Sequence, residues 1–121
     1  MSNPSATLPH HTLSVVVPMY NEQENAPLQI NAVQEALQNY PMPWEMILVD
    51  DGSSDGTVAA LCKRAKEIGP HIRIVELRRN FKQTAAMQAG IDAARGDVIV
   101  TMDGDLQNDP RDIPKLVARL L

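Results

Sequence analysis

Short apolar runs alternate with amphipathic stretches along the chain, and this alternation limits the fold more than any other feature of the sequence. The runs 13–17, 45–49, 72–77 and 98–102 have the length and flanking turn residues of strands. Since a segment with helical spacing follows each run, we predict an α/β fold, a Rossmann-like three-layer αβα arrangement with a mostly parallel sheet. The fully apolar run 98–102 is predicted to be central, and 72–77, which alternates with charged residues, to be an edge or half-exposed strand.

Apolar residues at helical spacing predict four helices. The segments are 24–39, 58–68, 84–94 and one that begins at Ile113. The apolar stripe of the last helix still runs at the end of the chain, so we expect the sequence to be the N-terminal half of a longer domain. Residues 1–12 are predicted to be a flexible tail, and residues 13–121 the folded part.

Charge and composition exclude several classes of protein. Fifteen acidic against eleven basic residues give a formal charge of −4, which argues against a nucleic-acid partner. The single cysteine, Cys62, rules out an internal disulfide and fits a reducing compartment. No apolar run approaches the roughly 18–20 residues that span a bilayer, and the first residues do not resemble a signal peptide. We therefore expect a soluble, cytoplasmic chain.

Polar clusters follow three of the four predicted strands. They comprise residues 18–22, 50–55 and 103–109. In parallel α/β sheets, ligands bind outside the carboxyl ends of the strands, so these three loops should converge on one rim. The sequence has no Gly-x-Gly-x-x-Gly motif after the first strand and no P-loop, which argues against those two ways of holding nucleotide phosphates.

An Asp-x-Asp pair, Asp103 and Asp105, lies in the third cluster. Side chains two positions apart in an extended stretch point to the same side, so both carboxylates should face one point. With the amide oxygen of Gln107 they suit a hard divalent cation, Mg²⁺ or Mn²⁺, held jointly with phosphate oxygens. The alternative is a solvated acidic turn in which Asp109 and Asp112 cap the next helix.

The second cluster imitates a calcium-binding loop. Its twelfth position is Cys62 instead of the bidentate glutamate that such a loop requires, so calcium binding is excluded. Helix capping explains most of this cluster, but it does not explain two adjacent acids at a strand end, Asp50 and Asp51. A carboxylate that accepts a hydrogen bond from the ring N–H of uracil or guanine would explain them.

The other two loops offer an aromatic ring and cations. Tyr20 provides a flat surface for stacking a base beside polar groups that suit a ribose. The alternative is an ordinary turn in which Asn21 caps the following helix. The segment 78–83 places three cations after the third predicted strand, where they suit phosphates. A solvated basic loop is the alternative there.

Taken together, four motifs resemble the family 2 glycosyltransferases with the GT-A fold, and most closely their polyprenyl-phosphate branch, which includes dolichyl-phosphate mannose synthase and the undecaprenyl-phosphate sugar transferases. The motifs are VVVPMYNEQEN (15–25), ILVDDGSSDGT (47–57), LRRNFKQTAAMQAGIDAARGD (77–97) and VTMDGDLQNDP (100–110). The resemblance implies a membrane-associated, inverting enzyme of cell-envelope biogenesis that moves a sugar from a UDP- or GDP-linked donor to a polyprenyl phosphate. It places the full-length protein at the cytoplasmic face of the inner membrane. Residues 13–121 would hold the donor and would be inactive alone.

The resemblance also implies roles for single residues. The nucleotide-binding residues are Pro18, Tyr20, Glu22, Asp50, Asp51 and Asp103, with Asp51 on the base and Asp50 supporting its turn. Asp103 and Asp105 are the implied catalytic residues, and with Gln107 they hold Mg²⁺ or Mn²⁺ on the diphosphate, where the metal neutralises charge on the leaving group. Lys82 stands where these sequences usually carry glycine, and it adds a cation that suits a phosphate.

Two alternatives of different classes stay open. A receiver-type signalling domain, phosphorylated on an aspartate, matches the length, fold class and clustered acids, although the acidic pair follows the second strand and no fifth strand supplies the expected lysine. A catalytically inert nucleotide-binding module would keep the fold without the chemistry. An open sheet edge would also favour a homo-oligomer.

Overall fold

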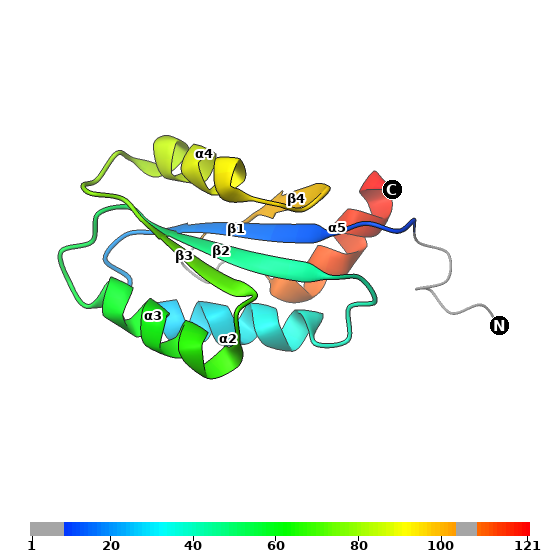
Figure 1. The fold of residues 1–121 in the computed structure, drawn as a ribbon, viewed down its shortest axis with the longest axis horizontal. Helices are drawn as coiled ribbons and strands as arrows, with labels where there is room; N and C mark the ends of the chain where they lie inside the picture. The colour runs from blue at the N-terminus through cyan, green and yellow to red at the C-terminus, as the bar shows by residue number, and fades with distance from the viewer. Residues whose placement is uncertain (1–8, 104–108) are drawn as a thin grey trace.

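The computed structural model describes residues 9–103 and 109–121 and confirms an α/β fold. Strands and helices alternate along the chain, followed by a short 3-10 helix and a last α-helix (Figure 1). The elements are β1 Leu13–Met19, α2 Ala26–Leu37, β2 Trp44–Asp50, α3 Thr57–Ile68, β3 Ile72–Glu76, α4 Gln83–Ala93, β4 Val98–Thr101, η1 Pro110–Asp112 and α5 Ile113–Leu120. These bounds lie within a few residues of the predicted runs.

The four strands form one parallel sheet in the order β3-β2-β1-β4. β1 and β2 are central, and β3 is an edge strand as predicted. The run 98–102 was predicted to be central, whereas within the described residues β4 pairs only with β1 and lies at the other edge of this sheet. Its apolar sequence has another cause: Val98 and Val100 pack toward one face of the sheet while Ile99 packs toward the other. A strand covered by helices on both faces is apolar whatever its place in the sheet.

Helices cover both faces of the sheet and produce the three layers. On one face, α2, α3 and α5 bury a large aliphatic cluster, which includes Ile30, Leu61 and Val117. On the other face, α4 packs alone against a smaller cluster around Val16 and Ile47 (Figure 1). The buried core is therefore almost wholly aliphatic, and two of the scarce aromatic side chains, Tyr40 and Trp44, pack against it at its border.

The predicted flexible tail is too long at its C-terminal end. His11 is only 2% exposed, and its Nε2 lies 2.5 Å from the Tyr40 hydroxyl oxygen. The Thr12 N–H donates to Asp97 Oδ2 at 3.1 Å. Burial raises the pKa of the Tyr40 hydroxyl above its ordinary value. Residues 11 and 12 therefore belong to the folded part, because they form hydrogen bonds with other segments at the end of the sheet where β1 begins.

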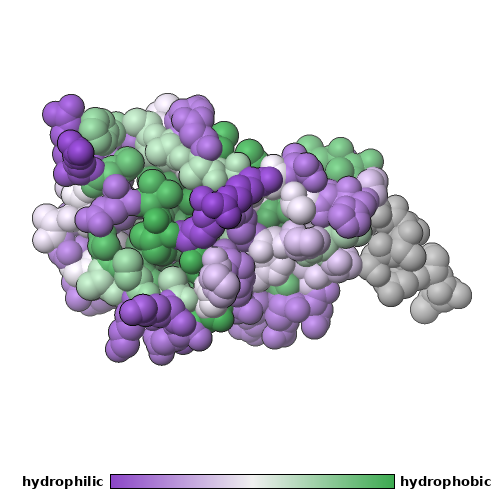
Figure 2. Space-filling view, viewed as in Figure 1, coloured by the Kyte–Doolittle hydropathy of each residue, from purple (hydrophilic) through white to green (hydrophobic). Residues whose placement is uncertain are grey.

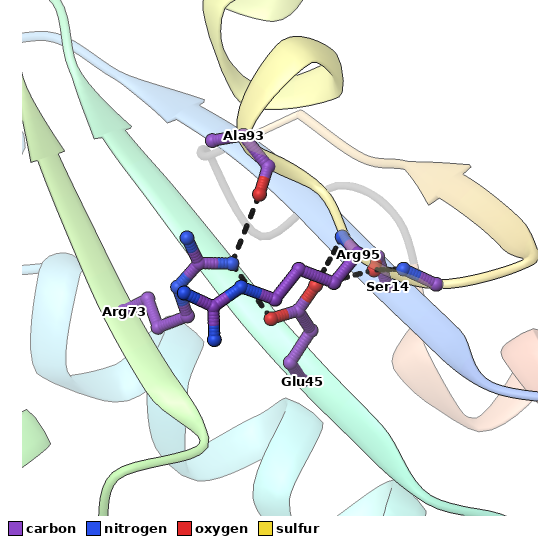
Figure 3. Close-up of polar contacts among 6 residues, drawn as sticks. Ser14, Glu45, Arg73, Ala93 and Arg95 are labelled. Carbon is purple, nitrogen blue, oxygen red and sulfur yellow. Dashed lines mark hydrogen bonds and ion pairs between the residues drawn. The ribbon is translucent and has the colours of Figure 1, made fainter.

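A polar cluster around Glu45 fastens the amino-terminal ends of the strands together (Figure 3). The Glu45 carboxylate accepts hydrogen bonds from Ser14 Oγ at 2.6 Å, from the Arg95 N–H at 2.8 Å and from Arg73 Nη1 at 2.7 Å. The same Arg73 nitrogen donates to the Ala93 carbonyl at 3.0 Å. The Glu45 carboxylate of β2 thus connects β1, β3 and the segment that follows α4. Burial alone would raise the pKa of Glu45, but these hydrogen bonds and the Arg73 charge together lower it.

Replacing Glu45 with glutamine is expected to lower the free energy of unfolding at pH 7 by about 1–2 kcal/mol. The folded-state pKa lies below the ordinary value of 4.5, so the carboxylate stabilises the fold above pH 4.5 and loses this effect as the pH falls through the lower value. Urea unfolding of both proteins over a pH series should show the difference shrinking in acid. Glu67→Gln is the matched control, since Glu67 pairs with Arg64 at the surface, 3.7 Å apart. An unchanged difference across the series would contradict the assignment.

The open edge of the sheet carries a shallow apolar groove. It lies between α3 and β3, has a volume of about 760 Å³, and includes Ala65, Pro70, Ile72 and Ile74 in its lining. On the face of the molecule shown in Figure 2, apolar side chains gather near the middle and hydrophilic ones border them.

Within the described residues, no helix combines the length and apolarity needed to cross a membrane.

Candidate functional site

Loops from the carboxyl ends of β1, β2 and β3, together with Asp103 just after β4, line one pocket. Its volume is about 630 Å³. The lining residues are Pro18, Met19, Tyr20, Glu22, Asp51, Asn80, Lys82, Gln83 and Asp103. The predicted convergence is confirmed for the loops after β1 and β2 and for Asp103, the first residue of the third cluster. Residues 104–108 of that cluster lie outside the described residues, and the β3–α4 loop also lines the pocket. Parallel strands end at one edge, so residues far apart in the sequence meet there.

The two adjacent acids at the end of β2 lie in different surroundings. Asp50 is 1% exposed and its carboxylate accepts two hydrogen bonds from Ser53, from the N–H at 3.0 Å and from Oγ at 2.5 Å. Asp51 is 3% exposed and lines the pocket. Its Oδ1 accepts the Phe81 N–H at 2.8 Å, while Oδ2 accepts nothing from the described residues. Asp50 therefore holds the turn, and Asp51 keeps one oxygen for a ligand.

Gly52 makes this turn feasible. Its φ is +73°, a conformation that glycine adopts without steric cost. An added Cβ would lie 2.2 Å from the carbonyl carbon of Arg79 and 2.5 Å from the backbone nitrogen of Asn80. The β2–α3 loop and the β3–α4 loop thus touch backbone to backbone, and this contact brings Asp51 within hydrogen-bond distance of Phe81.

The β1–α2 loop is tied to the β2–α3 loop by side chains that the sequence did not single out for this purpose. Asn21 does not cap α2, whose first flanking residue is Asn25. Instead Asn21 has a φ of +51°, its N–H donates to Ser53 Oγ at 2.8 Å, and its Oδ1 accepts the Ser54 N–H at 2.9 Å. The Glu22 N–H donates to Thr57 Oγ1 at 3.0 Å. Because groups of the chain itself make these bonds, this wall of the pocket is preorganised.

Tyr20 and Pro18 form the apolar part of this wall. Pro18 is buried within β1, whereas Tyr20 is 46% exposed at the rim. An exposed aromatic ring beside polar groups is suited to stacking against a flat ligand. Glu22 lies at the same wall and is half-buried, with its Oε2 2.8 Å from Asn25 Nδ2. These three residues come from the end of β1 and the loop after it, and all three line the pocket.

Asp103 enters the pocket from the end of β4. Gln83, the first residue of α4, donates from Nε2 to Asp103 Oδ1 at 2.8 Å. The predicted partners Asp105 and Gln107 lie outside the described residues. Asp109 accepts the Arg111 N–H at 3.0 Å and so caps η1, and its contacts with Arg111 lower the pKa of Asp109. Within 9–103 and 109–121, no group of three histidine, cysteine or carboxylate side chains is arranged to hold a metal.

The β3–α4 loop contributes residues with unusual features. Asn80 lines the pocket, and its buried Oδ1 has no hydrogen-bond partner among the described residues. Lys82 precedes α4 with φ +78° and ψ 161°, a region used almost only by glycine that costs about 1–3 kcal/mol for other residues. Arg79 instead stacks over the Phe81 ring, 4.7 Å from its centroid, and does not line the pocket. The sequence alone gave no reason to single out Asn80 or Gln83 within the segment 78–83 as pocket residues.

The charges and donors of the pocket suit a polar, partly aromatic ligand. Glu22, Asp51 and Asp103 contribute three carboxylates, and Lys82 is the one cationic side chain among the described lining residues. Asp51 Oδ2 and Asn80 Oδ1 are acceptors for donors on a ligand. Asp103 supplies the hard oxygen that Mg²⁺ or Mn²⁺ prefers, so this part of the donor set fits a divalent cation. A base with ring N–H groups, attached to phosphates that carry a cation, matches these features.

Solved structures with this architecture define the class of protein as a GT-A glycosyltransferase domain. A mannosyltransferase from Pyrobaculum calidifontis, solved with GDP-Man and Mn²⁺, superposes with a TM-score of 0.74 at 28% identity over 86% of this chain and 30% of that one. Glucosyl-3-phosphoglycerate synthase from Mycobacterium tuberculosis, solved with Mn²⁺ and UDP, gives 0.72 at 26% identity over 92% and 40%. It has also been crystallised with Mg²⁺ and UDP.

The sequence assigns the chain to a family within this class. Residues 14–121 match Glycosyl transferase family 2, and the chain belongs to it. A dodecaprenyl-phosphate galacturonate synthase from Rhizobium johnstonii is 56% identical over 89% of this chain. An undecaprenyl-phosphate 4-deoxy-4-formamido-L-arabinose transferase from Salmonella choleraesuis is 44% identical over 92%. The chain spans about a third of the length of both relatives, 32% and 34%. The family confirms the resemblance and does not favour a receiver domain or an inert module.

Proposed function

We propose that this domain binds the donor of a sugar transfer, a sugar linked to UDP or GDP. The observation that carries the proposal is the shared pocket, which Pro18, Tyr20 and Glu22 line together with Asp51 and Asp103. We further propose that the whole protein transfers the sugar, with inversion, to a polyprenyl phosphate. The relatives named for dodecaprenyl-phosphate and undecaprenyl-phosphate products support this acceptor.

In this proposal the nucleotide lies along the β1 and β2 ends of the pocket. The base stacks on Tyr20, and its ring N–H donates to Asp51 Oδ2, the oxygen that Phe81 leaves available. Asp50 has no direct contact; it holds the turn through Ser53. Both uracil and guanine carry a ring N–H, so the carboxylate alone accepts either base.

The diphosphate lies toward Asp103, which with Asp105 and Gln107 would hold Mg²⁺ or Mn²⁺. When bound, the metal would neutralise the negative charge that develops on the departing nucleoside diphosphate. The neighbours crystallised with Mn²⁺ or Mg²⁺ support this choice of ion. The attacking group is the acceptor phosphate, which is already ionised at neutral pH, so the chain needs no strong general base. The lipid part of the acceptor would place the protein at the cytoplasmic face of the membrane.

Titration calorimetry with UDP and GDP tests the proposal. We expect one nucleotide to bind in the presence of Mn²⁺, and we expect Asp103→Ala and Asp105→Ala each to weaken that binding by about a hundredfold. In chelator, the variants should bind at least as well as the unmodified chain, because the lost interaction passes through the metal and an unneutralised carboxylate repels the diphosphate. Asp92→Ala is the control, since Asp92 lies on α4, bonds to Gln88 and is outside the pocket. A folded chain that binds neither nucleotide would refute the donor site.

A further inference from the structure

Lys82 has a backbone conformation that does not suit a lysine. With φ +78° and ψ 161° it lies in a region where a side chain is sterically disfavoured, directly before α4. The resemblance to family 2 glycosyltransferases predicts glycine at this position, which would carry no such strain. Strained residues of this kind cluster at ligand sites, because the contacts of the surrounding structure hold them in place.

The Lys82 carbonyl accepts the Ala86 N–H at 3.0 Å, and hydrogen bonds of both neighbouring residues flank residue 82. On one side, the Phe81 N–H donates to Asp51 Oδ1 at 2.8 Å. On the other side, Gln83 Nε2 donates to Asp103 Oδ1 at 2.8 Å. Residue 82 therefore lies between the carboxylate proposed for the base and the carboxylate proposed for the metal. The part of a nucleotide sugar that connects these two places is its diphosphate.

The charges of the pocket favour a cation at this place. Three carboxylates line the pocket, from Glu22, Asp51 and Asp103, and they repel a diphosphate. Lys82 is the single cationic side chain among the described lining residues, and no hydrogen bond or ion pair joins its ammonium group to another described residue. Its ammonium group is therefore available for an anionic ligand.

We propose that Lys82 binds the diphosphate of the donor directly, so that part of the donor affinity does not depend on a metal ion. The inference rests on the proposed function, because it needs a nucleoside diphosphate in this pocket. It adds a fixed positive charge that glycine at this position would lack. It also implies that the chain accepts backbone strain at residue 82 in exchange for phosphate affinity.

The test uses two variants and a series of ligands in chelator. Lys82→Met removes the charge but keeps the bulk and the strain, whereas Lys82→Gly removes both. The ligands are uridine, UMP and UDP, with guanosine, GMP and GDP as the second series. For the base that binds, we expect both variants to lose about tenfold in affinity for the diphosphate and to keep the affinity of the unmodified chain for the nucleoside. The loss should shrink as salt is added.

Thermal unfolding separates strain from charge. We expect Lys82→Gly to raise the unfolding midpoint by about 4 °C, because it relieves the strained backbone, and Lys82→Met to leave the midpoint nearly unchanged. Equal losses for nucleoside and diphosphate, or no loss at all, would overturn the inference and leave the donor site intact. Absence of binding by the folded, unmodified chain would overturn both this inference and the proposed function.

Discussion

Alanine in place of Gly52 is expected to lower the free energy of unfolding by about 3–5 kcal/mol. Two effects add at this position. The φ of +73° is unfavourable for any residue with a Cβ, and that Cβ would lie 2.2 Å from Arg79 C and 2.5 Å from Asn80 N. Both atoms belong to the backbone, so no rotation of a side chain relieves the overlap. The β3–α4 loop must move, and the Asp51–Phe81 hydrogen bond should break with it.

Equilibrium unfolding in urea, followed by far-ultraviolet circular dichroism, measures this loss. Gly56→Ala is the matched control in the same loop. Its Cβ would meet only the flexible end of the Gln23 side chain, 2.8 Å away, and Gly56 has a φ of −84°. We expect the control to cost less than about 1 kcal/mol. Equal effects of the two substitutions would show that the close backbone contact at Gly52 does not stabilise the fold.

Asparagine in place of Asp51 is expected to weaken nucleotide binding by about a hundredfold with little change in stability. An asparagine side chain keeps an oxygen that can accept the Phe81 N–H, so the loop contact survives. Its amide nitrogen then replaces Oδ2 and presents N–H groups to the ring N–H of the base. Two donors face each other, and the hydrogen bond proposed for the base is lost.

Calorimetric titration with UDP and GDP, together with thermal unfolding, checks this expectation. Asp55→Asn is the control: Asp55 is an acid of the same loop, its Oδ1 accepts the Thr57 N–H at 2.9 Å, and it does not line the pocket. Hydrogen bonds from Thr57 lower the pKa of Asp55, so its charge is retained at neutral pH. Unchanged nucleotide affinity in a folded Asp51→Asn protein would refute the base contact.

The sequence alone determined the class of the fold and the edge of the sheet that carries the site. Apolar runs such as 13–17 and 45–49 define strands through local periodicity, and Gly69 ends α3 through local geometry, with its N–H donating to the Ala65 carbonyl. Local patterns of this kind can be recognised without knowing any partner. Parallel strands then place the loops at 18–22 and 50–55 on one edge whatever the details of packing.

Tertiary structure alone decided which side chains act on one another across the chain. The apolar run of β4 gave no information about its sheet neighbours, because helices cover it on both faces. Three contacts join residues more than 20 positions apart and depend on how the strands and loops pack: Glu45 with Ser14, Asp51 with Phe81, and Asn21 with Ser54. Periodicity and turn chemistry describe neighbours in the sequence, whereas these contacts depend on the distances that strand order and helix packing impose.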